Sequence, residues 1–455
     1  MQNLQPTIRW VNHASFVLQH GDVRLISDPW LFGSAFNNGW DLLCETKFTI
    51  DDFEQQGITH LWFSHEHPDH FAPPVLKQIP AHVRQNITVL FQTTEDQKVL
   101  RYCRVLGFQT VELPVHGWYE LTPDLRVMCG KIPFFDSWLL IEAGETKILN
   151  ANDCVVDGEG IASEIARYTG AVDVLLTQFS YANWEGNPDE LELRVASAAE
   201  KLRRVKLQVE TFTPTYVIPF ASFVYFSHEE NFFCNDAINT IRDAHTFIHT
   251  QTDVIPVVLY PDDCWTVGAS HDNETSLRAY DADYDLSQKL LRQTDSVTLD
   301  TLVTLSHDYI QRMSAQNSRF FIKLLSLPPL RYFEPLRLAL TDLKKVVLFD
   351  MTQGLQVVHD IDEYSLDEYS LDEYSPDDAD IFLSSESLAY IFQFDWGFDT
   401  LTVNGRFQAS QTQYKRMIKT LFLGSLNNTG RYLHPKTLFD IEFVKRALRK
   451  LRKLT

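Results

Sequence analysis

The chain has 455 residues, of which 44% are hydrophobic and 22% are charged, a composition typical of globular proteins. This length exceeds what one hydrophobic core usually supports, so two or three domains are expected. The formal net charge of −21 repels phosphate-rich surfaces, which argues against nucleic acid and anionic membranes as general partners.

The sequence shows no pattern for export or membrane insertion. The N-terminal stretch MQNLQPTIRW has no basic segment followed by an apolar one, and no run of about 18 uncharged apolar residues occurs. The six cysteines form no C-x-x-C or C-x-H pair, which argues against a zinc ribbon and against a disulfide framework. We therefore expect a cytoplasmic protein.

Short strands dominate the first part of the chain, with helices between them. A helix is predicted at 71–79, where prolines occupy the first turn, another at 94–107, which Gly107 ends, and a charged helix at 189–209. This alternation predicts an α+β fold with two sheets sandwiched between helices, in the order αβ/βα. The predicted strands are 8–11, 15–19, 23–27, 58–64, 86–92, 110–115, 125–132, 137–143, 146–152, 172–179 and 215–226.

The pattern changes twice after this region. We place the first domain at 1–250, a mostly helical extension at 251–340 and a smaller strand-rich domain at 341–455, with strands at 344–351, 354–361, 379–385 and 400–407. Between the second and third of these strands, DEYSLDEYSLDEYSP (362–376) repeats an acidic five-residue unit. We expect this repeat to be a mobile loop at an exposed hairpin tip.

Residues 64–70, SHEHPDH, gather potential metal ligands directly after the apolar strand 58–64. His65 and His67 are two residues apart and can converge on one ion, while the turn at Pro68 can direct Asp69 and His70 to a second position. A single metal site needs three or four ligands, so this density favours two metal ions. Ser64 is the one residue of the stretch that looks like an ordinary surface residue.

The pattern H-x-H-x-D-H after a buried strand resembles the metallo-β-lactamase fold, and NHASFVLQHGDVRLISDPW (12–30) resembles the first strands of that family. The resemblance implies that His65 and His67 hold the first metal and that Asp69 and His70 hold the second. It also implies a bridging aspartate, which ILNANDC (148–154) supplies as Asp153.

Two further ligands of the family pattern have no direct match. Where a third histidine is expected the sequence has Asp136 in FFDSWLLIE, with His116 as the alternative. For the last histidine the resemblance favours His228 in FSHEEN. A carboxylate in place of an imidazole tilts the expected metals from zinc towards iron, since iron and manganese accept mixed shells of histidine and carboxylate. His13 is expected beside the metals or facing the substrate.

Several segments resemble one branch more narrowly, that of CMP-N-acetylneuraminate hydroxylase. They are DSWLLIEAGETKILNANDC (136–154), QFSYANWEGNP (178–188), IPFASFVYFSHEENFFCNDAINT (218–240) and FQFDWGFDTLTVNGRF (392–407). That family carries a Rieske iron–sulfur domain for which this sequence has no matching cysteine–histidine pairs. Electrons would therefore come from a separate protein, the substrate or a small reductant. Residues 341–455 resemble a sterol-carrier-like domain, which would pack on the first domain or help to form a homodimer.

Two functions follow from these expectations. The first is a non-haem di-iron oxygenase or oxidase that acts on a small molecule. The second is a zinc- or manganese-dependent hydrolase of an ester, amide or phosphodiester, in which the metals lower the pKa of a water and Asp69 orients it or takes a proton. Trp184, Glu185 and Phe223 are the expected pocket residues.

Overall fold

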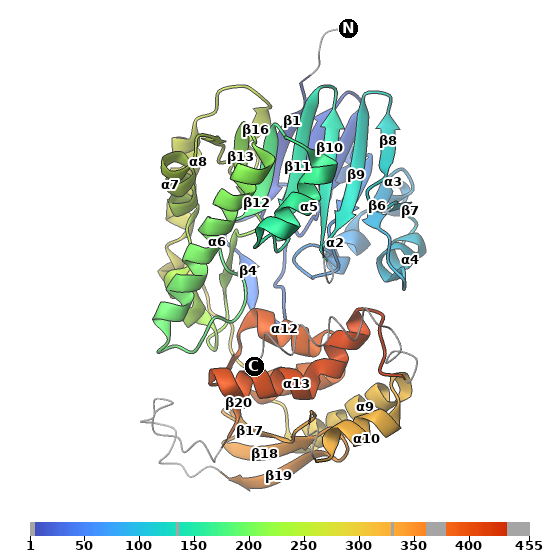
Figure 1. Ribbon diagram of the computed structural model, residues 1–455, viewed down its shortest axis with the longest axis vertical. Helices are drawn as coiled ribbons and strands as arrows, with labels where there is room; N and C mark the ends of the chain where they lie inside the picture. Colours follow the sequence, from blue (N-terminus) through green and yellow to red (C-terminus); the bar gives the residue numbers. More distant parts are fainter. Residues whose placement is uncertain (1–4, 133–135, 329–331, 361–378, 435–455) are drawn as a thin grey trace.

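The computed structural model describes residues 5–132, 136–328, 332–360 and 379–434. The acidic repeat 362–376, predicted to be a mobile loop, lies outside the described residues. The described residues form an N-terminal unit, residues 5–288, and a C-terminal unit, residues 297–434, which lie one above the other in Figure 1.

The N-terminal unit is built on two seven-stranded sheets (Figure 1). In the first sheet, the strands from β3 to β7 run parallel, and the remaining pairs are antiparallel. In sheet order, its strands are β16 (Cys264–Thr266), β1 (Thr7–Asn12), β2 (Ser15–His20), β3 (Val23–Ser27), β5 (His60–Phe63), β6 (Thr88–Gln92) and β7 (Gln109–Leu113).

The second sheet is mixed in the same way, with parallel pairs from β15 to β11 and antiparallel pairs from β11 to β8. Its strands, in sheet order, are β15 (Ile255–Pro256), β13 (Tyr216–Phe220), β12 (Val174–Gln178), β11 (Thr146–Asn152), β10 (Ser137–Ala143), β9 (Leu125–Lys131) and β8 (Trp118–Thr122). A two-stranded pair joins β4 (Trp40–Leu42) to β14 (Val224–Phe226).

Successive side chains of a strand point to opposite faces of its sheet, and this explains why each sheet has a core on both sides. In β5, Trp62 belongs to the core that joins the two sheets, whereas Leu61 and Phe63 face a second core beneath the helices of the outer layer. The αβ/βα sandwich predicted from the sequence is confirmed. The helices of this unit are α1 (Asp52–Gln55), α2 (Pro73–Gln78), α3 (Ala81–Arg84), α4 (Lys98–Val105), α5 (Glu159–Thr169), α6 (Leu191–Phe212), α7 (Ile241–Gln251) and α8 (Asn273–Asp283), with 3-10 turns at Phe232–Ala237 and Leu286–Gln288.

The C-terminal unit has a five-stranded sheet with its own hydrophobic core. In sheet order, its strands are β19 (Gly354–Asp360), β18 (Lys345–Asp350), β17 (Leu336–Leu340), β20 (Ile381–Leu383) and β21 (Phe407–Gln408). Its helices are α9 (Leu299–Gln316), α10 (Arg319–Ser326), α11 (Ser385–Gln393), α12 (Gly397–Asn404) and α13 (Gln411–Asn428). The likeness to a sterol-carrier domain stays a prediction.

Two sequence predictions differ from this arrangement. The segment 251–340 is not a separate helical extension, because α8 packs into the core of the N-terminal unit while α9 and α10 pack into that of the C-terminal unit. The strand predicted at 400–407 is mostly the helix α12. Phe398 and Leu401 are one helical turn apart and both are buried, so packing overrides the strand preference of the local residues.

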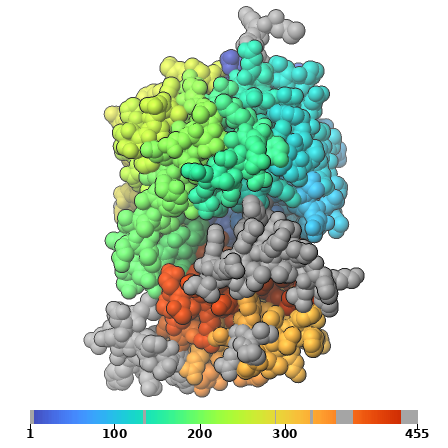
Figure 2. Space-filling view, viewed as in Figure 1, coloured from blue at the N-terminus to red at the C-terminus, as the bar shows by residue number. Residues whose placement is uncertain are grey.

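The two units are joined through hydrogen bonds between buried groups. Asn404 Nδ2 donates to the carbonyl of Phe36 at 3.0 Å, and Asn231 Nδ2 donates to the carbonyl of Asn404 at 2.7 Å. Figure 2 shows the orange and red surface of the C-terminal unit against the lower edge of the N-terminal unit. Among the described helices, none is long and apolar enough to cross a membrane.

Candidate metal centre

The loop after β5 places two imidazoles side by side. The backbone turns at His67, whose carbonyl accepts hydrogen bonds from the amides of His70 and Phe71 at 3.0 and 2.7 Å. His65 Nε2 lies 2.8 Å from His67 Nδ1, and Asp136 Oδ1 lies 3.6 Å from His65 Nε2. Asp136 directly precedes β10, at the same edge of the sandwich. His65, His67 and Asp136 form the first donor set.

A second donor set lies next to the first. Asp69 Oδ2 is 3.4 Å from His70 Nε2 and 3.3 Å from His13 Nε2, and the ligand atoms of these three residues lie within 4.8 Å of one another. His13 lies in the short turn between β1 and β2, far from the loop in sequence. The structure therefore places His13 among the donor residues, a position that sequence reasoning did not assign to it.

Asp153 lies between the two donor sets. It follows β11, and its Oδ2 is 3.7 Å from His65 Nε2 and 3.5 Å from His70 Nε2. One carboxylate oxygen thus faces an imidazole of each set. This is the position that the predicted bridging role requires.

Backbone strain accompanies three of the positions that build the centre. His13, Asp28 and Asn152 have φ angles of 40°, 36° and 36°, a region that residues other than glycine rarely adopt. Such strain persists only where the surrounding structure holds it, and it is concentrated at functional sites. Asn152 immediately precedes Asp153, so the strained residue sets the direction of the bridging carboxylate.

Ser64 and Asp28 hold the imidazoles in place. Ser64 is fully buried, and its Oγ lies 2.9 Å from His65 Nδ1 and 3.1 Å from His70 Nδ1. Asp28 Oδ2 lies 3.0 Å from His70 Nδ1, and Asp28 Oδ1 accepts a hydrogen bond of 2.8 Å from the amide of Ser64. The interpretation of Ser64 as a surface residue was wrong. These partners orient the other ring nitrogens towards the donor sets, as in metal sites generally.

Burial and neighbouring charges shift the pKa values of the groups in the centre. Burial lowers the pKa of His70, but the carboxylates of Asp153, Asp69 and Asp28 outweigh it and raise that pKa well above its ordinary value. Burial lowers the pKa of His65 well below its ordinary value and also lowers the pKa of His67, so both imidazoles are neutral and keep a lone pair. Burial opposes the Asp153 carboxylate, but the surrounding imidazoles, of which His70 is the one whose own pKa is raised, outweigh it and hold the pKa of Asp153 well below its ordinary value. Burial and the neighbouring charge of Asp153 raise the pKa of Asp136.

Four buried atoms of the centre have no hydrogen-bond partner within the described part of the chain. They are His13 Nδ1, His70 Nε2, Asp69 Oδ1 and Asp153 Oδ1. An unpaired buried carboxylate oxygen is costly, and such groups are normally satisfied by a ligand, water or ion. The unpaired atoms, the neutral imidazoles and the three carboxylates fit two bound metal ions.

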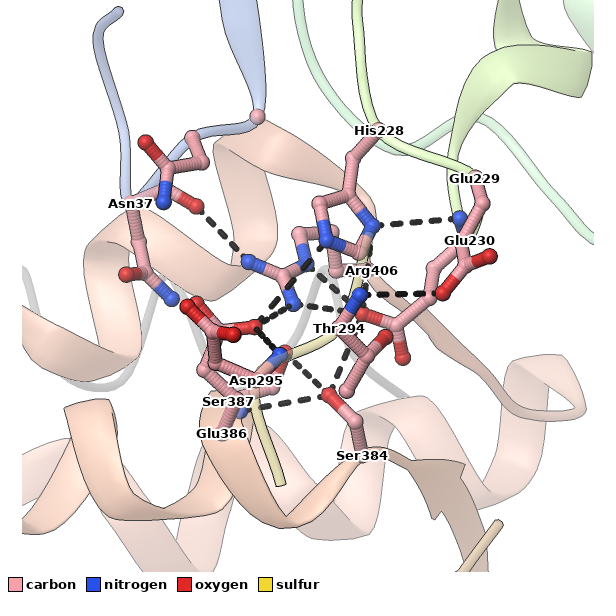
Figure 3. A network of polar contacts seen from close by, with 12 residues as sticks. Asn37, His228, Glu229, Glu230, Thr294, Asp295, Ser384, Glu386, Ser387 and Arg406 are labelled. Atoms are coloured by element: carbon pink, nitrogen blue, oxygen red, sulfur yellow. Dashed lines mark hydrogen bonds and ion pairs between the residues drawn. The ribbon is translucent and has the colours of Figure 1, made fainter. Parts of the chain in front are cut away.

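The structure does not bring His228 into this centre. His228 follows β14 and lies in a polar network between the two units (Figure 3). Its Nδ1 accepts a hydrogen bond of 3.2 Å from the amide of Glu230, and its Nε2 is 4.0 Å from Glu386 Oε2. Burial and the charge of Arg406 lower its pKa to about 4. The predicted metal role of His228 is corrected: its partners are the side chains that join the units.

The alternative ligand His116 is also remote from the donor sets. Its ring stacks on Tyr168 and Trp138, with centroid separations of 3.7 and 5.7 Å. Two of the expected pocket residues are likewise packed elsewhere. Phe223 belongs to the core between the sheets, and Trp184 packs on rings of the C-terminal unit. Of the two alternatives, Asp136 is the one that lies beside His65.

Sequence reasoning missed an aromatic residue of the C-terminal unit. The ring of His67 lies 5.8 Å from that of Trp396 and 5.7 Å from that of Phe36, with both pairs nearly perpendicular. Trp396 directly precedes α12 in the segment FQFDWGFD. The resemblance of that segment was a usable signal, but nothing in it indicated a contact with a residue more than 300 positions away.

Alanine substitutions at His13 and His228 should separate their roles. We expect His13→Ala to lose one of about two bound metal ions per chain, because it removes a donor from the second set. His228→Ala should keep both ions and lower only stability. Metal analysis of the two purified variants checks this. Equal metal loss in both variants, or loss in His228→Ala alone, would return the ligand role to His228.

Arg406 is the centre of the network in Figure 3. It is fully buried, and its guanidinium contacts Glu230 and Glu386, each at 2.7 Å, and donates to the carbonyl of Asn37 at 2.7 Å. Removing one partner of a buried ion pair leaves uncompensated charge, which typically costs about 3–5 kcal/mol. We expect Arg406→Met to lower the free energy of unfolding by that amount in denaturant titrations.

The pH dependence of this loss follows from Glu230. Burial raises the pKa of Glu230, although Arg406 opposes the shift, and removal of Arg406 raises the pKa further. Once Glu230 is protonated it no longer needs the guanidinium, so the difference between variant and parent should shrink as the pH falls from neutral. Arg242→Met is the control, because Arg242 joins Asp281 and Glu274 on the exposed surface and should cost less than about 1 kcal/mol. Similar losses in the two variants would contradict the account.

Comparison with known proteins agrees with this geometry. Residues 7–120 match the family model described as a beta-lactamase superfamily domain. The chain is 28% identical over 265 residues to the cytidine monophosphate-N-acetylneuraminic acid hydroxylase of Pongo pygmaeus, and 28% identical over 273 residues to that of Mus musculus. Each alignment covers 54% of this chain and 44% of the relative, so the chain matches less than half the length of these relatives.

Solved structures with a similar arrangement include the diiron β-hydroxylase CmlA from Streptomyces venezuelae, with 17% identity, a TM-score of 0.42 and coverage of 58% of this chain and 54% of that one. The metallo hydrolase Igni18 from Ignicoccus hospitalis has 15% identity, a TM-score of 0.39 and coverage of 58% and 99%. With the sheet order and the H-x-H-x-D-H loop, the family match shows that the N-terminal unit has the metallo-β-lactamase fold, and the sequence is similar to those of the hydroxylases named above.

Proposed function

We propose that the chain is a dinuclear metal enzyme that uses two iron ions and dioxygen to oxidise a small molecule. The observation that carries the proposal is the mixed donor set. Asp136 stands 3.6 Å from His65 Nε2, where a third imidazole would complete a nitrogen-rich zinc site. Two imidazoles with a carboxylate and open positions are typical of non-haem iron sites.

The ligand sets support two ions rather than one. His65, His67 and Asp136 offer one set, and His13, Asp69 and His70 offer the other, with Asp153 between them. Bound iron would supply the electrons and the open coordination positions that dioxygen requires.

The ionisation of Asp69 and the aromatic rings around the imidazoles suit this chemistry. Burial opposes the charge of Asp69, but His70 and His13 outweigh it and lower its pKa to about 2. Asp69 therefore stays ionised at neutral pH, which suits a ligand better than the proton carrier expected from the sequence. The rings of Trp30, Phe36 and Trp396 flank the imidazoles of His13 and His67 and keep water away from that side.

The sequence relatives support oxidation over hydrolysis, because the named relatives are hydroxylases. Their substrate is not carried over to this chain, which matches 44% of their length. We propose a small-molecule substrate and a separate electron donor or small reductant as the source of electrons.

Metal analysis of protein purified without added metal tests the proposal, followed by oxygen uptake with candidate reductants. We expect about two iron ions per chain and reductant-dependent oxygen consumption. Near-stoichiometric zinc or manganese with no oxygen uptake would favour the hydrolase, in which the metals lower the pKa of a water that attacks an ester, amide or phosphodiester.

A further inference from the structure

The exposure of the donor residues shows from which side a substrate can reach the centre. The side chains of His65 and His70 are 0% exposed, and those of His13 and Asp69 are 3% and 5% exposed. Asp136 and Asp153 are 17% and 19% exposed, and His67 is also only half-buried. A molecule can therefore reach the centre past these two carboxylates, at the edge of the second sheet where β11 ends and β10 begins.

Gln178 and Lys201 lie on this side of the centre. β12 runs parallel to β11, and Thr177 pairs with Asn152, so Gln178 and Asp153 follow at adjacent strand ends. The helix α6 packs beside β12 and carries Lys201, whose Nζ donates to Gln178 Oε1. Both side chains are half-buried rather than sealed in the core.

The same edge leads to the second donor set. Gln178 Nε2 donates to the carbonyl of Ala221 at 3.5 Å, and the amide of Ala221 donates to the carbonyl of His13 at 3.0 Å. Lys201 and Gln178 thus lie between the strand end that carries Asp153 and the residues that support His13. A group bound by Lys201 would be next to the bridging carboxylate.

The partner of Lys201 is uncharged. Within the described part of the chain, no carboxylate forms an ion pair with its ammonium group, and the carbonyl oxygen of the Gln178 amide is its hydrogen-bond acceptor. Burial and the charge of Arg204 lower its pKa to about 8, while Asp153 raises it, so Lys201 remains mostly cationic at neutral pH. A half-buried ammonium with a neutral partner favours an anionic ligand.

The net charge of the centre with two metal ions bound also favours an anionic ligand. Two divalent ions carry more positive charge than the carboxylates of Asp69, Asp136 and Asp153 neutralise, and Lys201 adds to this excess on the side open to substrate. If Lys201 served only to balance the carboxylates, it would be superfluous once the ions are bound.

We propose that Lys201 recognises an anionic group of the substrate, a carboxylate or a phosphate, which replaces Gln178 Oε1 at its ammonium group. The rest of the substrate then extends past Asp153 to the metal ions. The proposal rests on the dinuclear centre proposed above and names the substrate class of that site. The lysine ammonium group is a point charge that binds either a carboxylate or a phosphate, so the experiment includes a probe for each.

Calorimetric titration of the metal-loaded, full-length protein tests the proposal, with benzoate, phenyl phosphate and neutral benzamide as probes. We expect the parent to bind at least one of the two anions more tightly than benzamide. Lys201→Met should weaken that anion at least about tenfold, since a charged hydrogen bond is lost. Lys201→Arg should retain most of the affinity, and benzamide binding should be the same in all variants. The anion that binds more tightly identifies the anionic group of the substrate.

Arg203→Gln is the matched control, because it removes one positive charge from the same helix at an exposed position that pairs with Glu200. It should bind all probes as the parent does. Unchanged anion affinity in Lys201→Met would overturn the proposal, as would equal binding of anions and benzamide by the parent. Loss of metal in Lys201→Met would also overturn it, since Lys201 would then support the carboxylates. A parent that binds fewer than two ions refutes the dinuclear centre itself, which metal analysis reports separately.

Discussion

Asp153→Ala is expected to lower the metal content of the purified protein from about two ions per chain to fewer than one. The reason is the position of the carboxylate, whose Oδ2 is 3.7 Å from His65 Nε2 and 3.5 Å from His70 Nε2. Its removal takes a donor from both sets and leaves buried imidazoles without the charge that faces them. Turnover should fall by more than the roughly 10–100-fold that the loss of a residue supporting a ligand costs.

Asp157→Ala is the matched control for this change. Asp157 is an exposed aspartate four positions further along the same loop, and its substitution removes the same charge from the same connection. We expect it to keep both ions and normal turnover. If Asp153→Ala also kept two tightly bound ions, the bridging position would be wrong and the two donor sets would be independent.

Asp136→His is expected to change which metal the centre takes. The substitution converts the mixed set at His65 and His67 into three imidazoles, the donor set that zinc tolerates best in catalytic sites. It also removes a carboxyl whose pKa burial and Asp153 raise well above its ordinary value, so a cation no longer has to displace a tightly held proton there.

Competition between iron and zinc, followed by metal analysis, measures the effect. We expect the ratio of bound zinc to bound iron to rise about tenfold or more over the parent, and oxygen uptake to fall with the iron content. Asp136→Glu keeps the carboxylate and serves as the control, with a ratio close to that of the parent. An unchanged ratio in Asp136→His would mean that Asp136 does not contribute to the choice of metal.

The sequence predicted the parts of the centre that are local. The loop 64–70 packs its donors into seven positions, so it could be found from the order of residue types alone, whereas Asp153 was assigned through the resemblance to the metallo-β-lactamase fold. The sandwich was predictable for the same reason, because short apolar strands alternate with amphipathic helices. Asp136 was a candidate because the same resemblance expects a ligand near the start of the strand that follows it.

The misassigned residues depend on contacts that no local pattern reports. His13 and His228 each follow or precede apolar segments, and only the folded chain shows that the first meets Asp69 while the second meets Glu386. Ser64 looked exposed because serine usually is, yet it is buried between two imidazoles that need it. The helix α12 was read as a strand because its phenylalanine, threonine and valine residues favour strands in isolation.

Anomalous diffraction from crystals of the iron-loaded protein tests the central claim most directly. Data collected on either side of the iron absorption edge should show two separate peaks, one bounded by His65, His67 and Asp136 and the other by His13, Asp69 and His70, with Asp153 reaching both. A single peak would contradict the dinuclear centre, and the absence of any peak between these side chains would contradict the metal site as a whole.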